Sequence, residues 1–350
     1  MLSGRPGLRF GARIPLLFAA LLLANLLAWA WAGTAFAGRP ALLGLALLAW
    51  MFGLRHAVDA DHIAAIDNVV RKLMYQGERP LLTGTYFSLG HSTVVVLAAG
   101  AVAAYATHLP ASLLAVSDAA GLAGAMVSAS VLLGLGLLNV VALSGAWRRL
   151  RQPPAGAGLS HDGSPSAGGM LSRLLQPLFR AIGRPWHMFP LGFLFGLGFD
   201  TATEIGLLGI AAAQSAQGVS PLQTMVFPAL FTAGMVLVDS GDSVLMVGAY
   251  GWAQHHPRRK LWYDLIITGL SVAVALVIGG IEAGGLLAGH FGLQGRLWSA
   301  VANAGAHGTQ LGLGVVAAFL LVWGSSVAID RRRVRSAAAL RAGVRQPGSR

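Results

Sequence analysis

Apolar stretches long enough to cross a lipid bilayer recur along the whole 350-residue chain. A membrane-spanning helix needs about 20 mainly apolar residues, because its backbone polar groups must find their partners within the segment. Eight stretches meet this requirement: Ile14–Ala32, Ala41–Ile66, Leu81–Tyr105, Gly121–Ala146, Met188–Ala213, Leu222–Tyr250, Tyr263–His290 and Thr309–Ile329. Charged residues make up 11% of the chain, against about 25% in soluble proteins. The sequence therefore predicts an all-α, polytopic membrane protein with eight transmembrane helices and excludes a soluble globular protein.

The basic residues are placed asymmetrically along this predicted topology. Of the 25 Lys and Arg residues, all except Arg39, Arg296 and the intramembrane Arg55 fall in the termini and in alternate loops. Such a bias is the positive-inside signature, and it predicts cytoplasmic N and C termini. The net charge of +12 thus reflects membrane orientation, and we expect no nucleic-acid partner.

Composition also suggests how the chain is divided. Ser, Gly and Pro crowd the segment from Gln152 to Gly169, which lacks apolar periodicity and is typical of a flexible linker. We expect a first four-helix membrane half over 1–147, a flexible cytoplasmic linker over 148–187, a second four-helix half over 188–330 and a basic cytoplasmic tail over 331–350. The chain has no cysteine, which rules out thiolate ligation of a metal and leaves the redox compartment open.

The N-terminal segment also has some features of a cleaved signal peptide. Arg5, Arg9 and Arg13 precede its apolar run, and Ala35-Phe36-Ala37 follows it. The run is longer than the apolar core of a signal peptide, which has about 7–15 residues. We therefore expect a retained first helix.

Seven acidic side chains fall inside the predicted spans, and six of them cluster in three short motifs. They are Asp59, Asp61, Asp200, Glu204, Asp239, Asp242 and Glu282. Each charge costs about 2.5–3.5 kcal/mol at the bilayer centre on insertion scales. An intramembrane ionisable group therefore indicates a functional site whose partners lie in the bundle interior. No role is assigned to Glu282.

The second span carries the motif Arg-His-Ala-Val-Asp-Ala-Asp-His-Ile, beginning at Arg55. On a regular helix, His56, Asp59 and His62 fall within an arc of about 120° and face one ion. Asp61 lies about 200° from Asp59, so it serves another partner or the helix is locally unwound. Arg55 precedes Asp59 by one turn and is placed to pair with it. The alternative is a purely structural network of salt bridges and hydrogen bonds between helices, although such a network does not require two imidazoles in addition to carboxylates.

Three further motifs carry polar side chains into the predicted spans. His91 lies in the third span, and alone it fits a hydrogen-bonded bundle residue as well as a ligand. Asp200 and Glu204, four apart in the fifth span, share one helical face and repel each other unless a proton or a cation lies between them. Asp239 and Asp242 form a second such pair in the sixth span.

Nitrogen and oxygen donors without sulfur suit nickel, cobalt, zinc or manganese. Magnesium and calcium prefer oxygen alone, so the histidines argue against them. The predicted metal ligands are His56, Asp59, Asp61, His62, His91, Asp200, Glu204, Asp239 and Asp242. A proton relay that drives another solute stays open, because chains of Asp, Glu and His also conduct protons.

The four motifs resemble the signatures of the nickel/cobalt transporter family, NiCoT, in their order and on the expected helices. They are Arg55–Ile63, Phe87–Val95, Leu197–Glu204 and Gly234–Asp242. The resemblance covers the whole chain and implies an eight-helix permease of the bacterial cytoplasmic membrane with high affinity and low capacity for Ni²⁺, Co²⁺ or both. It also implies that His56, Asp61 and His62 are needed for transport. The metal is then a transported substrate and not a permanently bound cofactor.

The sequence favours uptake by a secondary permease over two other functions. Export by a related permease is the first alternative, but exporters often carry a His-rich cytoplasmic loop, and the segment 148–187 holds only His161 and His187. An intramembrane metalloenzyme requires His-Glu-x-x-His or repeated His-x-x-His-His boxes, and the sequence contains neither. It also contains no Gly-x-x-x-x-Gly-Lys-Ser/Thr loop, so we expect neither enzymatic activity nor an ATPase subunit.

Short sequence matches connect the two halves of the chain. Phe52–Leu54 recurs as Phe195–Leu197, and Gly90–Ser92 resembles Gly241–Ser243. The paired spans cross in opposite directions, which is the pattern of an inverted repeat with its substrate site at the repeat interface. The matches predict an inverted repeat of helices one to three and four to six, with chance similarity as the competing explanation.

Overall fold

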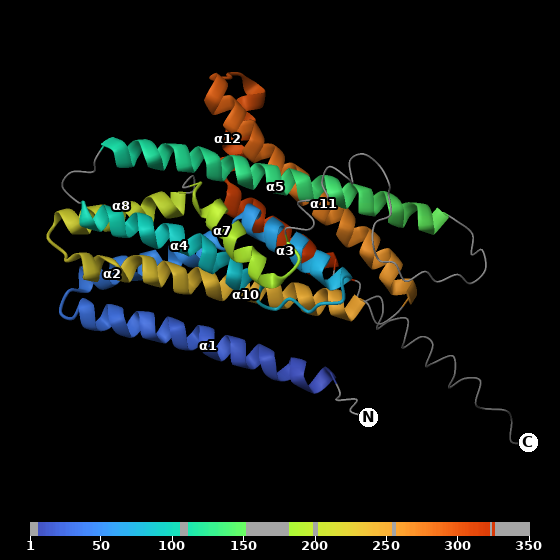
Figure 1. Ribbon diagram of the computed structural model, residues 1–350, viewed down its shortest axis with the longest axis horizontal. Coiled ribbons are helices and arrows are strands. Elements are labelled where there is room, and N and C mark those ends of the chain that lie inside the picture. The colour runs from blue at the N-terminus through green and yellow to red at the C-terminus, as the bar shows by residue number, and fades with distance from the viewer. Residues whose placement is uncertain are drawn as a thin grey trace, which may run out of the picture.

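A computed structural model describes residues 6–105, 111–151, 182–198, 202–253, 257–322 and 324–325 (Figure 1). Every regular element in these ranges is helical, which confirms the all-α prediction. The elements are α1 Pro6–Ala35, α2 Pro40–His56, α3 Ala60–Tyr75, α4 Thr83–Ala104, α5 Ala111–Arg151, the 3-10 helix η1 Pro185–His187, α7 Met188–Gly196, α8 Ala202–Ala216, α9 Pro221–Thr224, α10 Val226–Ala253, α11 Pro257–Phe291, α12 Arg296–Ala306 and a further helix, Gly308–Val322, referred to below as helix 308–322.

Five of the described helices are long and apolar enough to cross a membrane, and the number rises to seven if each of two bent helix pairs crosses as one span. The bent pairs are α2 with α3, at 50°, and α12 with helix 308–322, at 71°. The predicted span Met188–Ala213 corresponds to α7 and α8, which flank residues 199–201, outside the described residues. Most of the predicted linker (152–181) and the basic tail (331–350) also lie outside them.

The second predicted span is not a regular helix, because it breaks inside its own His/Asp motif. α2 ends at His56, and Asp59 is extended at φ −66° and ψ 147° before α3 begins at Ala60. An aspartate at this position usually caps the new helix by accepting a backbone N–H, but the Asp59 side chain makes no such bond. The local unwinding proposed as one explanation for Asp61 is thus what the structure shows.

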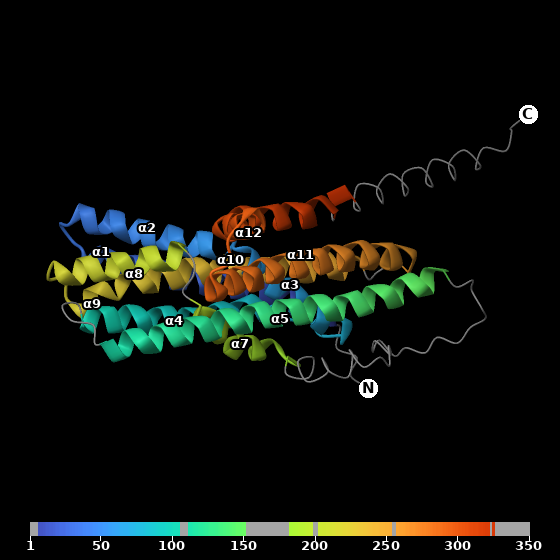
Figure 2. The same ribbon diagram turned by 90° about the horizontal axis from the view of Figure 1, so that it is seen from above.

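The helices form an elongated bundle in which helices distant in sequence pack together. α10 and α8 lie between α2 and α4 (Figure 2), and α5 packs along α11. α1 is fixed to this bundle by polar as well as apolar contacts: Asn25 donates to the backbone oxygen of Ala233 on α10 and accepts from the indole of Trp50 on α2. These contacts place α10 at the centre of the bundle and α2 directly against it.

Close packing of α2 on α10 depends on Gly53, because a Cβ added there would lie 2.0 Å from the backbone oxygen of Phe231. Small residues at helix interfaces allow such approach in membrane proteins. We expect Gly53→Ala to lower the thermal unfolding temperature in detergent, at a cost of about 1–3 kcal/mol from overpacking. Gly44→Ala on the same helix is the matched control, since a Cβ there meets nothing within 4 Å. Equal unfolding temperatures for the two variants would contradict the packing argument.

Candidate metal centre

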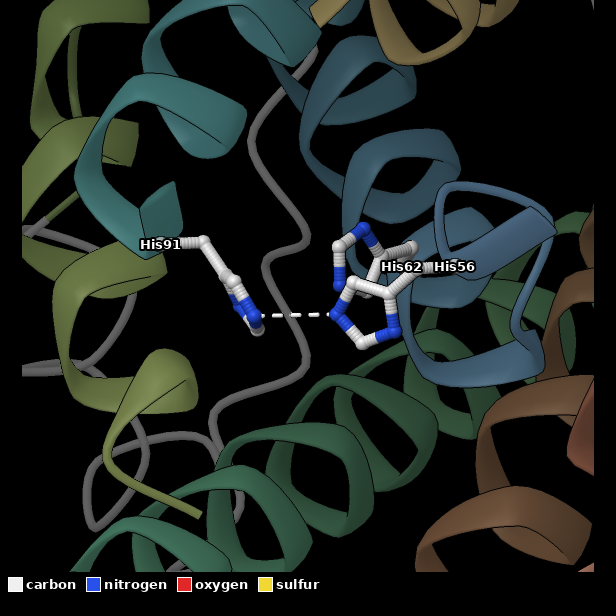
Figure 3. Close-up of side chains that lie close together, drawn as sticks. All are labelled: His56, His62 and His91. Carbon is white, nitrogen blue, oxygen red and sulfur yellow. Dashed lines mark hydrogen bonds between the residues drawn. The ribbon is translucent and has the colours of Figure 1, made fainter. Parts of the chain in front are cut away.

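Three histidines from three helices converge in the interior of the bundle (Figure 3). His56 ends α2, His62 lies in the first turn of α3, and His91 lies midway along α4. Their exposed fractions are 1%, 0% and 3%, and each offers one ring nitrogen within 4.8 Å of the other two. Two nitrogens on opposite sides of a transition-metal ion lie about 4.2 Å apart, given metal–nitrogen distances of about 2.1 Å. The cluster therefore has nearly the dimensions of a three-imidazole metal site.

Carboxylates hold two of these imidazoles through their Nδ1 atoms. His56 Nδ1 lies 3.2 Å from Asp59 Oδ2, and His62 Nδ1 lies 3.2 Å from Asp239 Oδ2 on α10. Ser88 of α4 also donates a hydrogen bond to Asp239 Oδ2. An imidazole that donates its Nδ1 proton to a carboxylate keeps Nε2 as a lone-pair donor, which is the usual arrangement around metal-bound histidine.

Glu204 reaches the same space from the first turn of α8. Its Oε1 atom lies 2.9 Å from His91 Nε2 and 3.9 Å from His56 Nε2, and the residue is 1% exposed. His56 Nε2 and His91 Nε2 are in turn 2.9 Å apart. A carboxylate oxygen and two ring nitrogens thus meet at one point, and a divalent cation placed there offsets the buried negative charge of Glu204.

Within the described part of the chain, some buried polar atoms of this region have no hydrogen-bond partner. They include His62 Nε2, His91 Nδ1 and Asp239 Oδ1. Buried polar atoms in folded proteins are nearly always paired, so an unpaired one needs an explanation. His62 Nε2 has such an explanation, because it is the atom left available for an ion when Nδ1 is held by Asp239.

The remaining predicted ligands are placed differently. Asp61 lies in the first turn of α3 and is partly exposed, where the helix N-terminus favours a negative charge. Asp242 lies one turn beyond Asp239 on α10, and its Oδ2 atom is buried without a partner among the described residues. Asp200 lies outside the described residues.

Sequence reasoning missed several polar residues around the centre. Thr203 Oγ1 lies 3.2 Å from His56 Nδ1, and Thr309 Oγ1 donates to Asp59 Oδ1 at 2.5 Å. Asp67, just beyond the second predicted span, is 1% exposed and accepts hydrogen bonds from Tyr250 and Ser271. Thr203 and Ser88 lie inside two of the predicted motifs, and this membership was a signal available from the sequence, whereas their contacts with His56 and Asp239 were not.

Comparison with known proteins agrees with this geometry. A family model described as "High-affinity nickel-transport protein" (NicO) matches residues 42–329. The chain is 51% identical to the hydrogenase nickel incorporation protein HupN of Bradyrhizobium diazoefficiens, over 93% of this chain and 86% of that protein. It is 48% identical to a high-affinity nickel transport protein of Cupriavidus necator, over 95% and 94% of the two chains.

One similar protein is named for a different metal. The cobalt transport protein NhlF of Rhodococcus rhodochrous is 38% identical over 82% of this chain and 84% of its own length. No solved structure matches the chain.

Proposed function

Because the chain belongs to the family of high-affinity nickel-transport proteins, we propose that it is a secondary permease for uptake of Ni²⁺, Co²⁺ or both across the bacterial cytoplasmic membrane. The observation that carries the proposal is the buried convergence of His56, His62 and His91. Nickel and cobalt both accept imidazole nitrogen and carboxylate oxygen, which are the donors gathered here. Membership in a transporter family also argues against enzymatic activity. The cation is then the transported substrate of the permease and not a resident cofactor.

The geometry supports a division of labour among the predicted ligands. His56, His62 and His91 supply nitrogen, and Glu204 supplies an oxygen and one negative charge. Asp59 and Asp239 orient His56 and His62 through Nδ1. Asp61, Asp200 and Asp242 stay predicted residues of the path to and from the centre, because an approaching cation is attracted by carboxylates before it sheds its water.

The centre as described is closed to solvent, since none of its three imidazoles is more than 3% exposed. Transport then requires the bundle to open alternately toward each side. The interruptions of the helices are the natural hinges, because residues at element ends absorb large changes of φ and ψ. One interruption, between α2 and α3, lies directly beside His56 and Asp59.

We propose that the chain crosses the membrane eight times, with both termini in the cytoplasm, and that α7 and α8 together form the fifth span. We also propose that the two halves form an inverted repeat. Two parallels between the halves support the repeat. α2 packs on α10, and α7 packs on α4. In the first turn of α3, after the α2–α3 interruption, His62 contacts Asp239 on α10. In the first turn of α8, Glu204 likewise contacts His91 on α4. Each half thus contributes a short helix whose first turn faces the long helix of the other half.

The absence of cysteine from the sequence makes the topology testable by single-cysteine labelling. We expect Arg39→Cys to react with a membrane-impermeant maleimide added to intact spheroplasts, and Arg335→Cys to react only after permeabilisation. The physical reason is the charge asymmetry of the loops. Labelling of Arg335→Cys from outside would contradict cytoplasmic placement of the C terminus.

The proposed function is tested by accumulation of radiolabelled nickel and of radiolabelled cobalt in cells that express the protein, each competed with the other metal. Uptake above that of cells with an empty vector supports import. Faster loss of metal from preloaded cells, without uptake, would instead identify an efflux permease. Competition at equal concentrations ranks the two metals.

A further inference from the structure

Helix 308–322 begins against the interruption between α2 and α3. A Cβ added to Gly312 would lie 1.7 Å from the backbone oxygen of Val58, and one added to Gly308 would lie 3.7 Å from Asp59 Oδ1. Only a residue without a side chain allows the approach at Gly312. The first turn of this helix is therefore fitted to the segment that separates His56 from His62.

From this position, Thr309 forms hydrogen bonds with two charged residues: Arg55 on α2 and Asp59 in the interruption between α2 and α3. Its hydroxyl oxygen accepts from Arg55 Nε at 3.3 Å and donates to Asp59 Oδ1 at 2.5 Å. The other oxygen of Asp59 lies 3.2 Å from His56 Nδ1. Arg55, placed by the sequence to pair with Asp59, thus reaches that carboxylate through Thr309. A continuous hydrogen-bonded path leads from Arg55 to the imidazole of His56.

We propose that Thr309 is a positioning residue of the metal centre, acting through Asp59 on His56. The inference rests on the proposed function, in which His56 Nε2 binds the metal. A hydroxyl has one proton to donate, and because Arg55 approaches as a donor, that proton is directed to Asp59. Asp59, held at Oδ1, keeps Oδ2 toward His56 Nδ1. His56 then carries its proton on Nδ1 and presents the Nε2 lone pair to the ion.

A purely structural role for Thr309 makes a different prediction. The side chain also offers a methyl group, and the start of a helix often carries threonine for local reasons. Valine keeps the shape and the methyl group but loses the hydroxyl, whereas serine keeps the hydroxyl and loses the methyl. Thr93→Val is the matched control, because Thr93 is a partly exposed threonine of α4 that donates to Leu89 of its own helix.

The experiment measures Ni²⁺ affinity of the purified protein in detergent by competition with a chromophoric chelator, together with the visible spectrum of bound Co²⁺. We expect Thr309→Val to weaken affinity about 10–100-fold, as loss of an outer-shell partner does, and to alter the Co²⁺ spectrum. Thr309→Ser and Thr93→Val should stay close to wild type in both. Wild-type affinity in Thr309→Val, or equal losses in Thr309→Ser and Thr309→Val, overturns the proposal.

A double-mutant cycle separates the proposed path from a general loss of folding. If Thr309 acts through Asp59, Thr309→Val weakens Ni²⁺ affinity in the wild-type background and adds no further loss in an Asp59→Asn background. Equal losses in both backgrounds overturn the proposal. His56→Ala distinguishes the two levels of inference. Full affinity in His56→Ala removes the proposed site itself, whereas a loss there with no effect of Thr309→Val removes only the role of Thr309.

Discussion

Replacement of His62 by alanine is expected to abolish accumulation of nickel by expressing cells while the protein stays in the membrane. His62 is fully buried, its Nδ1 atom lies 3.2 Å from Asp239, and its Nε2 atom has no partner among the described residues. The substitution removes one of three nitrogen donors and leaves Asp239 facing a cavity without its imidazole. Uptake of radiolabelled nickel, normalised to the amount of protein in isolated membranes, measures the effect.

The matched control for this prediction is His290→Ala, which removes an exposed histidine at the end of α11. We expect its uptake to equal that of the wild type. Wild-type uptake by a correctly inserted His62→Ala variant would contradict the assignment of His62 as a ligand. Loss of uptake in both variants would show that the assay responds to histidine replacement in general.

Glu204→Gln should weaken binding of Ni²⁺ in detergent by a factor of about 100 to 4,000. The amide keeps the size of the side chain and a carbonyl oxygen near His91, but it removes a negative charge that lies within 4 Å of two ring nitrogens of the centre. Removing one partner of a buried charge pair costs about 3–5 kcal/mol, and 1.4 kcal/mol corresponds to a factor of ten. Equilibrium titration with Ni²⁺ measures the loss.

Glu282→Gln is the matched control, since Glu282 is another intramembrane carboxylate, partly buried on α11 and hydrogen-bonded to Ser128 on α5. It should bind Ni²⁺ as the wild type does. A loss below tenfold in Glu204→Gln would indicate that the imidazoles hold the ion without this carboxylate, and would remove Glu204 from the proposed ligand set.

The sequence predicted the helical class and the convergence of His56, Asp59 and His62, but for a partly wrong geometric reason. A regular helix was expected to align these three residues on one face, whereas the structure brings them together where the helix is interrupted. Hydropathy is averaged over about 20 residues, so a break of three residues leaves the apolar signal almost unchanged. Only the position of Asp61, on the wrong face of a regular helix, indicated the break.

Other parts of the site were beyond the reach of local patterns. Thr309 is separated from Asp59 by 250 positions, and threonine near a predicted helix start has many ordinary explanations. Asp67 was missed because the apolar run ends at Ile66, although α3 continues to Tyr75 and buries that carboxylate. The motifs identified which types of residue form the centre. Which of these residues pair with each other depends on tertiary contacts, and the periodicity of a single sequence does not contain them.

The contribution of distant helices to the centre has a consequence for biogenesis. α3 carries Asp61, Asp67, Arg71 and Lys72 within 16 residues, a sequence that is costly to transfer into lipid alone. Its partners Asp239, Tyr250 and Ser271, and Thr309, which donates to Asp59 just before α3, belong to helices synthesised much later. Until those helices leave the translocon, α3 has no complete set of neighbours. Stable burial of α3 therefore depends on helices that are synthesised after it, and we expect loss of the C-terminal helices to destabilise the N-terminal half as well.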